Sequence, residues 1–261
     1  MRAWGPIVTM TAMTTTHPTP HPSPSLAAPA ATARRPWAPA RVGGVAALVE
    51  AATYVVGFVL LAAYLAPEGY LDGTDDPAAA LTFLLEHQAA LYAWHVVIYL
   101  VAGVALVGLA AALHDRLRRA GSTLAPVATA FGLIWSGLVL AAGMVALVGQ
   151  GVVVDLHATD PAQAESTWVA VRAVQEGLGG GIELLGAMWV LALTAAGLRT
   201  GALGRGLTRL GVVVGVGGLL TVVPALEPVG APVFGLGFIA WFAWVGRTLL
   251  RDEAQAPAPS A

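Results

Sequence analysis

The sequence contains no cysteine, no lysine and no asparagine. Without cysteine the chain has no disulfide, no thiolate nucleophile and no cysteine-ligated metal or iron–sulfur centre, which excludes a whole branch of redox chemistry. Alanine, glycine, valine and arginine are abundant instead, a bias that is typical of G+C-rich bacterial genomes. We therefore expect a bacterial protein, although the missing cysteine leaves the redox compartment undecided.

Charge is also scarce, because only 11% of the 261 residues are charged whereas 57% are hydrophobic. The mean hydropathy is +0.75, and soluble domains carry about 25% charged residues. This composition indicates a protein whose main partner is the lipid bilayer. The formal net charge of -2 and the scattered arginines give no reason to expect a nucleic-acid partner.

The apolar residues come in blocks of about 20, the length that an α-helix needs to cross a bilayer. The sequence predicts an all-α, polytopic six-helix bundle over residues 42–251, with spans near 42–66, 91–113, 126–148, 177–198, 210–226 and 233–250. Residues 1–41, rich in Pro, Thr and Ala, and residues 252–261 are predicted to be disordered tails. The true start is either Met1 or Met13.

The arginines indicate how the chain is oriented. With six spans, all of the 13 basic residues except Arg172 fall on one side, and most of the acidic loop residues fall on the other. Cytoplasmic loops retain arginine and lysine. We therefore expect a multi-pass protein of the plasma membrane with both termini in the cytoplasm.

Two outer loops carry the same helix-start pattern, Asp76-Pro77 and Asp160-Pro161. Aspartate caps the free N–H groups of a helix and proline fits its first turn, so each pattern predicts a short outer amphipathic helix. These helices would rest on the membrane surface or on the top of the bundle. The repeated pattern arises by chance as easily as by duplication.

Three ionisable residues fall inside predicted spans: Glu50, His95 and Glu183. A charge at mid-bilayer costs at least about 2.5 kcal/mol, so each is a candidate for function. We expect His95 and Glu183 at similar depths, able to exchange protons, with Glu50 as an inner station. The alternative is that these groups only fix helix packing, and the same choice holds for Tyr54 and Tyr99, one turn from Glu50 and His95.

Glycines gather at the entry to the fourth span, at Gly177, Gly179, Gly180 and Gly181. Glycine lowers helix propensity, so this run predicts a helix break that would expose N–H groups to an anion. The alternative is close helix packing, because Gly177 and Gly181 have the small-xxx-small spacing. No strand surrounds the run, so it is no dinucleotide fingerprint.

Three stretches, 43–50, 86–88 and 174–183, resemble a bacterial multi-pass membrane family catalogued as domain of unknown function 4386. The resemblance covers about residues 42–251. It implies a helical membrane fold and a glycine-rich entry to the fourth helix, and it implies no activity.

Motifs for catalysis are missing from the sequence. There is no HExxH and no GxSxG, and Glu86, His87 and His157 are too loosely spaced to predict a metal site. We expect no catalytic residue, no metal and no cofactor, and we interpret the tryptophans at 94, 168, 241 and 244 as interfacial or packing residues. The favoured hypothesis is binding or translocation of a small solute or a proton; the alternatives are a non-transporting scaffold or regulatory subunit and, third, a membrane-embedded enzyme.

Overall fold

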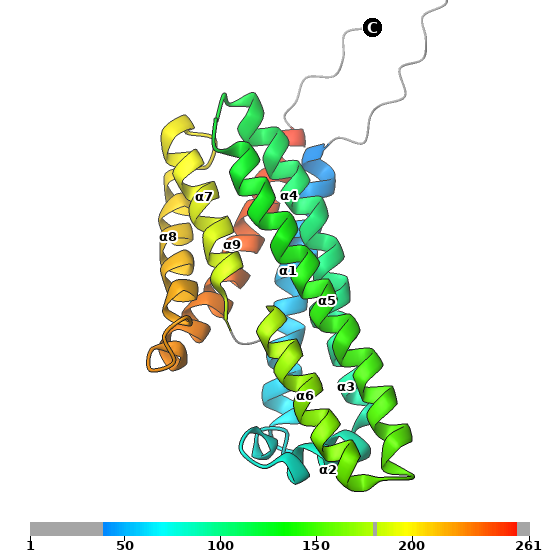
Figure 1. The fold of residues 1–261 in the computed structure, drawn as a ribbon. Coiled ribbons are helices and arrows are strands. Elements are labelled where there is room, and N and C mark those ends of the chain that lie inside the picture. Colours follow the sequence, from blue (N-terminus) through cyan, green and yellow to red (C-terminus); the bar gives the residue numbers. More distant parts are fainter. Residues whose placement is uncertain (1–38, 180–181, 255–261) are drawn as a thin grey trace, which may run out of the picture. The chain divides into compact units, whose positions relative to one another are not determined.

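The computed structural model describes residues 39–179 and 182–254, and all regular structure in these two ranges is helical (Figure 1). The expected all-α fold is therefore confirmed for the described residues. Two π-helical segments, η1 (Leu61–Leu65) and η3 (Val96–Val101), and one short 3-10 segment, η2 (Asp72–Thr74), interrupt or join the α-helices. The α-helices are α1 (Pro39–Leu60), α2 (Pro77–Glu86), α3 (Gln88–His95), α4 (Ala102–Arg119), α5 (Ala125–His157), α6 (Pro161–Gly179), α7 (Leu184–Thr200), α8 (Arg205–Leu220) and α9 (Glu227–Ala254).

Five helical stretches in the described part of the chain are long and apolar enough to cross a membrane. They are Pro39–Leu65, Gln88–Arg119, Ala125–His157, Pro161–Thr200 and Glu227–Ala254, of which Pro161–Thr200 comprises α6, α7 and the connection between them, where residues 180 and 181 are not described. The remaining predicted span falls on α8, which has 16 residues. At about 1.5 Å per residue α8 extends about 24 Å, less than the roughly 30 Å of a hydrocarbon core. The count of six spans therefore stays a prediction.

The helices continue beyond the predicted spans. α1 begins at Pro39, inside the predicted tail 1–41, and α9 ends at Ala254, inside the predicted tail 252–261. Both tail boundaries were therefore wrong by a few residues; residues 1–38 and 255–261 lie outside the described residues. The predicted bounds followed the apolar residues alone, whereas the helices also include flanking residues outside the apolar block.

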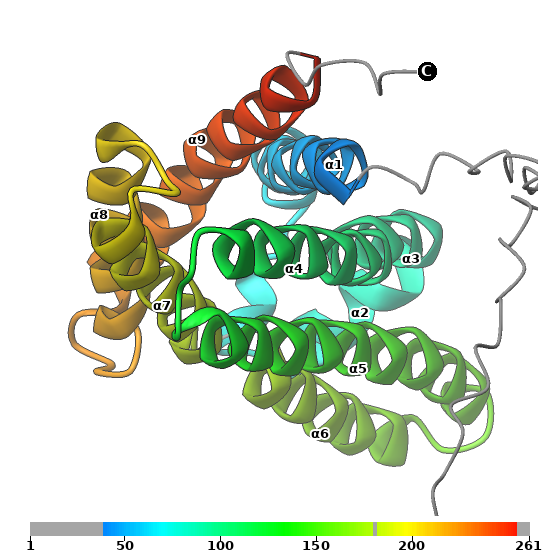
Figure 2. The same cartoon turned by 90° about the horizontal axis from the view of Figure 1, so that it is seen from above.

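The helices pack antiparallel, some against their neighbours in the chain and others against helices that are distant in the sequence. α4 lies between α1 and α5, and α6 and α7 both pack against α5 (Figure 2). α9 packs against both α1 and α8, so the last helix closes against the first. α1 and α9 approach each other closely at Gly44, where a Cβ would lie 2.6 Å from Leu250 Cγ. Such small-residue contacts are typical of helix packing within membranes.

The centre of the bundle is an aromatic core from α5, α7 and α9. Trp189 and Phe238 are fully buried. The ring centroids of Trp135 and Trp189 are 5.5 Å apart, and those of Phe238 and Phe242 are 4.6 Å apart. Aromatic rings bury large apolar areas and prefer such separations, so this core ties the three helices together.

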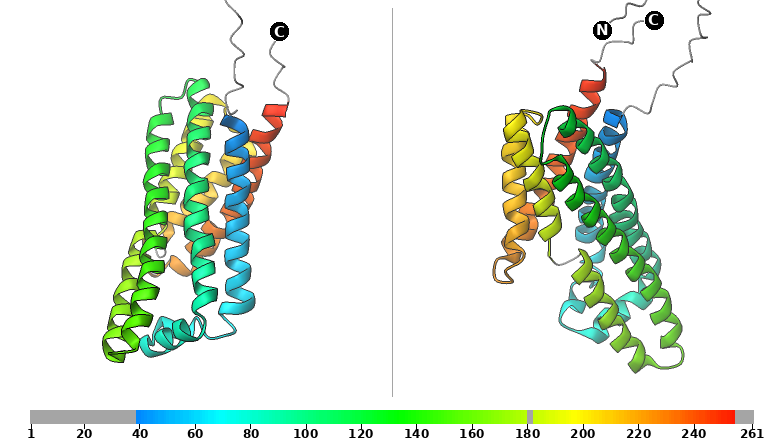
Figure 3. Two further views of the ribbon diagram at one scale, coloured as in Figure 1. Left: turned by 90° about the vertical axis from the view of Figure 1, so that its right-hand side faces the viewer. Right: turned by 45° about the horizontal axis from the view of Figure 1, so that its top comes forward.

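The α4–α5 and α7–α8 connections and the end of α9 lie at the same end of the bundle (Figure 3). Arg116, at the end of α4, donates from Nε to the carbonyl oxygen of Ala202 in the α7–α8 connection, at 2.9 Å. The same guanidinium also pairs with Asp252 near the end of α9. Three segments that the sequence prediction placed on one side of the membrane therefore touch one another.

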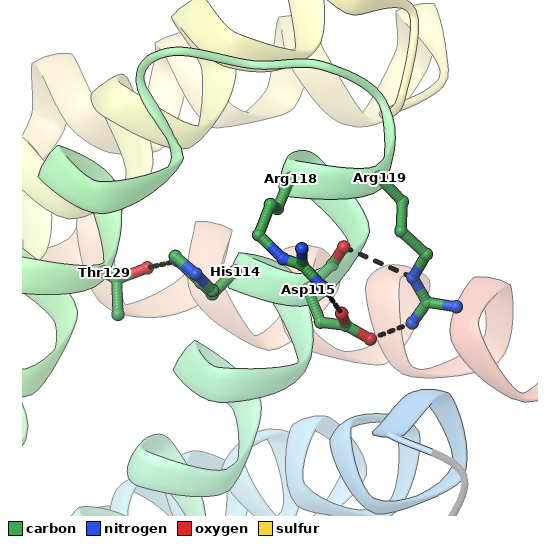
Figure 4. Close-up of polar contacts among 5 residues, drawn as sticks. All are labelled: His114, Asp115, Arg118, Arg119 and Thr129. Atoms are coloured by element: carbon green, nitrogen blue, oxygen red, sulfur yellow. Dashed lines mark hydrogen bonds and ion pairs between the residues drawn. The ribbon is translucent and has the colours of Figure 1, made fainter. Parts of the chain in front are cut away.

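At this end an acidic side chain forms ion pairs with two of the arginines that follow it in α4. Asp115 forms ion pairs with Arg118, at 3.4 Å, and with Arg119, both within the last turn of α4 (Figure 4). His114 Nδ1 lies 2.8 Å from the hydroxyl of Thr129 on α5. Because the ion pairs are exposed they add little to stability, about 0–1 kcal/mol each.

At the opposite end the two predicted helix starts are confirmed. Asp76 accepts hydrogen bonds from the backbone N–H groups of Ala78, at 2.9 Å, and Ala79, at 3.3 Å, and α2 begins at Pro77. Asp160 accepts from the N–H of Gln163 at 3.0 Å, and α6 begins next to it.

We predict that Asp76→Ala lowers the free energy of unfolding by about 1 kcal/mol, because it leaves two N–H groups of α2 without their cap. Thermal unfolding in detergent measures this as a fall of about 2–4 °C in the melting temperature. Asp75→Ala is the matched control, since Asp75 is exposed and precedes the cap. An equal fall in both variants would contradict the capping role.

The outer helices pack on other helices of the bundle. Leu84 of α2 and Trp168 of α6 are buried together, and the indole N–H of Trp168 donates to the carbonyl oxygen of Ala80 at 3.2 Å. α6 is also not short, because its 19 residues run along α5. The expectation of two short outer helices is therefore correct for α2. It is wrong for α6, which is longer and packs along α5.

Candidate functional site

A cavity of about 250 Å³ lies where α1, η3, α5 and the α6–α7 connection meet. At about 30 Å³ per water, it has room for about eight waters or a small organic molecule. Its polar and aromatic lining comes from Glu50, Thr53, Tyr54, Phe58, Trp94, Tyr99, Trp135 and Glu183. Small or aliphatic residues complete it: Gly57, Leu61, Ile98, Ala102, Leu106, Val139 and Gly179.

One face of α1 supplies the first acid. Glu50, Tyr54 and Phe58 follow one another at intervals of four residues, which places them on the same side of the helix. Glu50 is only 2% exposed, and its Oε1 has no hydrogen-bond partner among the described residues. The nearby hydroxyl of Thr53 donates to the backbone oxygen of Glu50, at 2.8 Å, and so does not satisfy the carboxyl group.

Both π-helical segments contribute to the cavity. η3 carries Ile98 and Tyr99, and η1 begins with Leu61. The hydroxyl oxygen of Tyr99 accepts a hydrogen bond from Gln175 Nε2 of α6 at 3.0 Å, which fixes the ring at the cavity wall. π-helical turns inside α-helices occur frequently at functional sites, so their position here favours a binding role for this region.

The wall between α1 and α3 is held by Trp94 and Gly57. The indole N–H of Trp94 donates to the carbonyl oxygen of Gly57 at 3.2 Å. A Cβ on Gly57 would lie 2.9 Å from Ile98 Cγ2 of η3, so glycine allows α1 and η3 to approach this closely. The tryptophan is therefore fixed in place before any ligand binds.

The second acid lies at the helix interruption. α6 ends at Gly179 and α7 begins at Leu184, and Glu183 directly precedes α7. Its backbone N–H donates to the hydroxyl of Thr221 in the α8–α9 connection at 2.8 Å, which fixes its depth in the bundle. Of the glycines predicted to form the break, Gly177 and Gly179 lie in the last turn of α6, directly before the interruption.

The other two glycines of that prediction, Gly180 and Gly181, lie outside the described residues. The neighbouring cavity is acidic, since Glu50 and Glu183 both line it. Carboxylates repel anions, so the anion site considered from the sequence has no support in the cavity lining.

His95 belongs to a different environment. It is 2% exposed, its Nδ1 is hydrogen-bonded to Gln150 Nε2 of α5, and it lines a second cavity of only about 20 Å³. No hydrogen bond joins His95 to Glu183 in the described structure, so direct proton exchange between them is not supported. The structure thus brings together Glu50, Tyr54, Tyr99 and Glu183 and leaves His95 out.

The small cavity beside His95 lies at the end that holds α2. Arg172 donates to the carbonyl oxygen of Gly73 at 2.6 Å and lies 3.9 Å from a carboxylate oxygen of Glu176. Burial raises the pKa of the Tyr70 phenol, Arg172 lowers it and Glu176 raises it. Tyr70 therefore stays neutral at ordinary pH, and with room for one water at most this cavity is too small for a ligand.

Sequence reasoning missed the aromatic part of the main cavity: Phe58, Trp94 and Trp135. For Phe58 a signal existed, because it follows Tyr54 by four residues on the helix that carries Glu50. Trp94 was interpreted from the sequence only as an interfacial or packing residue and Trp135 was not singled out, since the position of each depends on which helix faces meet. The packing interpretation is confirmed for Trp168 and Trp241, which are buried, whereas Trp244 is 48% exposed.

Comparison of the chain with protein-family models, with curated proteins and with solved structures finds no match. The family resemblance drawn from the sequence therefore stays a prediction. Within the described residues, no group of three or more histidine, aspartate or glutamate side chains is placed to hold a metal ion. What the site can do must be inferred from its own geometry.

Proposed function

We propose that this chain is a bacterial plasma-membrane protein that crosses the bilayer six times, with both termini in the cytoplasm, and that it binds and translocates a small solute or a proton through the cavity between Glu50 and Glu183. The observation that carries the proposal is the buried Oε1 of Glu50, which lacks a hydrogen-bond partner in the described structure beside a cavity of about 250 Å³. A buried carboxylate without a partner needs a cation, a proton or water next to it.

The apolar exterior supports the membrane part of the proposal. Large aliphatic side chains point outward on several helices, among them Val104 and Leu198, which are 66% and 69% exposed. Soluble proteins rarely expose apolar surface on this scale, and a bilayer removes it from water.

The depth of the two acids supports a role in passage through the membrane. Glu50 lies 11 residues beyond Pro39, about 17 Å from the arginine-bearing end at 1.5 Å per residue. Glu183 lies 17 residues before Thr200, about 26 Å from that end. In a hydrocarbon core of roughly 30 Å, one acid would thus stand near the midplane and the other near the outer face.

The six-span arrangement makes a prediction about sidedness. Because the chain has no cysteine, any labelling of a single-cysteine variant by a thiol reagent comes from the introduced residue. Asp75→Cys and Leu226→Cys should react with an impermeant thiol reagent on intact cells, whereas Arg118→Cys and Gly204→Cys should react only after the cells are opened. If Leu226→Cys and Gly204→Cys react from the same side, α8 does not cross the membrane as proposed.

The proposal also predicts that the cavity is reached by solutes. Ala102 lines the cavity, and Ala128, which is also buried, lies in the core away from it. In the purified full-length protein, Ala102→Cys should react with neutral methyl methanethiosulfonate at least tenfold faster than Ala128→Cys. Equal rates would mean that the cavity is closed to solutes, and the scaffold hypothesis would replace this one.

A further inference from the structure

We propose that the ligand of the cavity is an organic cation, that is, a protonated or quaternary amine. This inference rests on the proposed function and names the class of solute that the site takes. It is carried by the combination of a buried, unpartnered carboxylate oxygen with an aromatic lining in one cavity.

The charge of the lining has one sign. Glu50 and Glu183 enter from different elements, and no arginine or histidine is among the described residues that line the cavity. The chain has no lysine at all, so none is available to pair with either acid. A ligand that carries positive charge would supply the missing partner of Glu50 Oε1.

The aromatic residues favour an organic cation. Cations are attracted to the faces of Trp, Tyr and Phe rings, and quaternary ammonium groups are recognised in this way. Phe58 packs against α9 at a glycine, since a Cβ on Gly235 would lie 2.6 Å from Phe58 Cζ. Trp94 is fixed by its hydrogen bond to Gly57, so these rings do not have to be ordered by the ligand.

A metal cation fits the lining less well. Ca²⁺ takes about 6–8 oxygen ligands, whereas the hydroxyl of Thr53 donates to the backbone and that of Tyr99 is bonded to Gln175. Two carboxyl groups and the hydroxyl of Tyr54 remain, amid a mostly apolar wall. A proton alone would need neither the aromatic rings nor this volume.

The first test compares thiol reagents of similar size and opposite charge on Ala102→Cys in lipid nanodiscs. The trimethylammonium-ethyl methanethiosulfonate should react at least tenfold faster than the sulfonato-ethyl reagent, after correction for their rates with a free thiol in water. Adding Glu50→Gln and Glu183→Gln should remove this preference. Equal corrected rates would overturn the organic-cation proposal, while a fast reaction with the neutral reagent would still support an accessible cavity.

The second test uses protection by a ligand and its neutral analogue. Choline should slow the labelling of Ala102→Cys by the neutral reagent, and 3,3-dimethyl-1-butanol, in which carbon replaces the charged nitrogen, should slow it at least tenfold less at equal concentration. Equal protection by both compounds would mean that the cavity selects for shape without charge. Absence of protection by choline, together with equal rates for the charged reagents, would also count against the proposal.

Discussion

Trp189→Ala is expected to lower the free energy of unfolding by about 3–5 kcal/mol. Trp189 is fully buried, and its ring lies 5.5 Å from that of Trp135 and 5.6 Å from that of Trp241, so it joins α7 to α5 and α9. It also packs on α5 at a glycine, because a Cβ on Gly132 would lie 2.6 Å from its indole nitrogen. Removing the ring leaves a cavity between the three helices, and the cost of this cavity adds to the loss of apolar contacts.

Thermal unfolding of the detergent-solubilised protein measures the effect, and a fall of about 10 °C in the melting temperature corresponds to the expected loss. Trp244→Ala is the matched control, since the same residue type on α9 is 48% exposed. Trp189→Phe should fall between the wild type and Trp189→Ala, because it keeps one ring in the core. A change of under 1 kcal/mol for Trp189→Ala would show that the aromatic core does not hold the bundle together.

The fold was predictable where one physical signal dominates. Apolar blocks of about 20 residues placed α1, α4, α5, α7, α8 and α9, and the Asp76-Pro77 and Asp160-Pro161 pairs placed the starts of α2 and α6. The lengths of α5 and α6 were not predictable in this way. Gln150 and Asp155 lie beyond the predicted third span yet inside α5, because packing against α6 keeps a polar stretch helical.

The site was predictable in its acids and only partly in its geometry. Glu50 and Glu183 stood out because a carboxyl group is costly inside an apolar span. Counting residues along separate spans also suggested that His95 lies near Glu183, but depth alone does not say which way a side chain faces. In the structure Tyr99 lines the main cavity, whereas His95 is hydrogen-bonded to Gln150 and is not among the residues that line it.

The last prediction separates transport through the cavity from a purely structural role of its acids. Glu183→Gln and Glu50→Gln should abolish pH-dependent proton flux and choline uptake in reconstituted vesicles while leaving the folded protein in place. Glutamine keeps the size of the side chain and some hydrogen bonding, and an amide is cheaper to bury than a carboxylate. We therefore expect melting temperatures equal to or slightly above that of the wild type.

His95→Gln should show the reverse pattern. It alters the hydrogen bond to Gln150 outside the main cavity, so it should lower stability by about 1 kcal/mol and leave flux unchanged. The measurements are a pH-sensitive dye inside the vesicles, uptake of labelled choline, and thermal unfolding of all four proteins. If His95→Gln stops flux as Glu183→Gln does, the histidine belongs to the pathway after all. A wild type that moves neither protons nor choline, with variants that differ from it only in stability, would leave the acids as packing elements of a membrane scaffold.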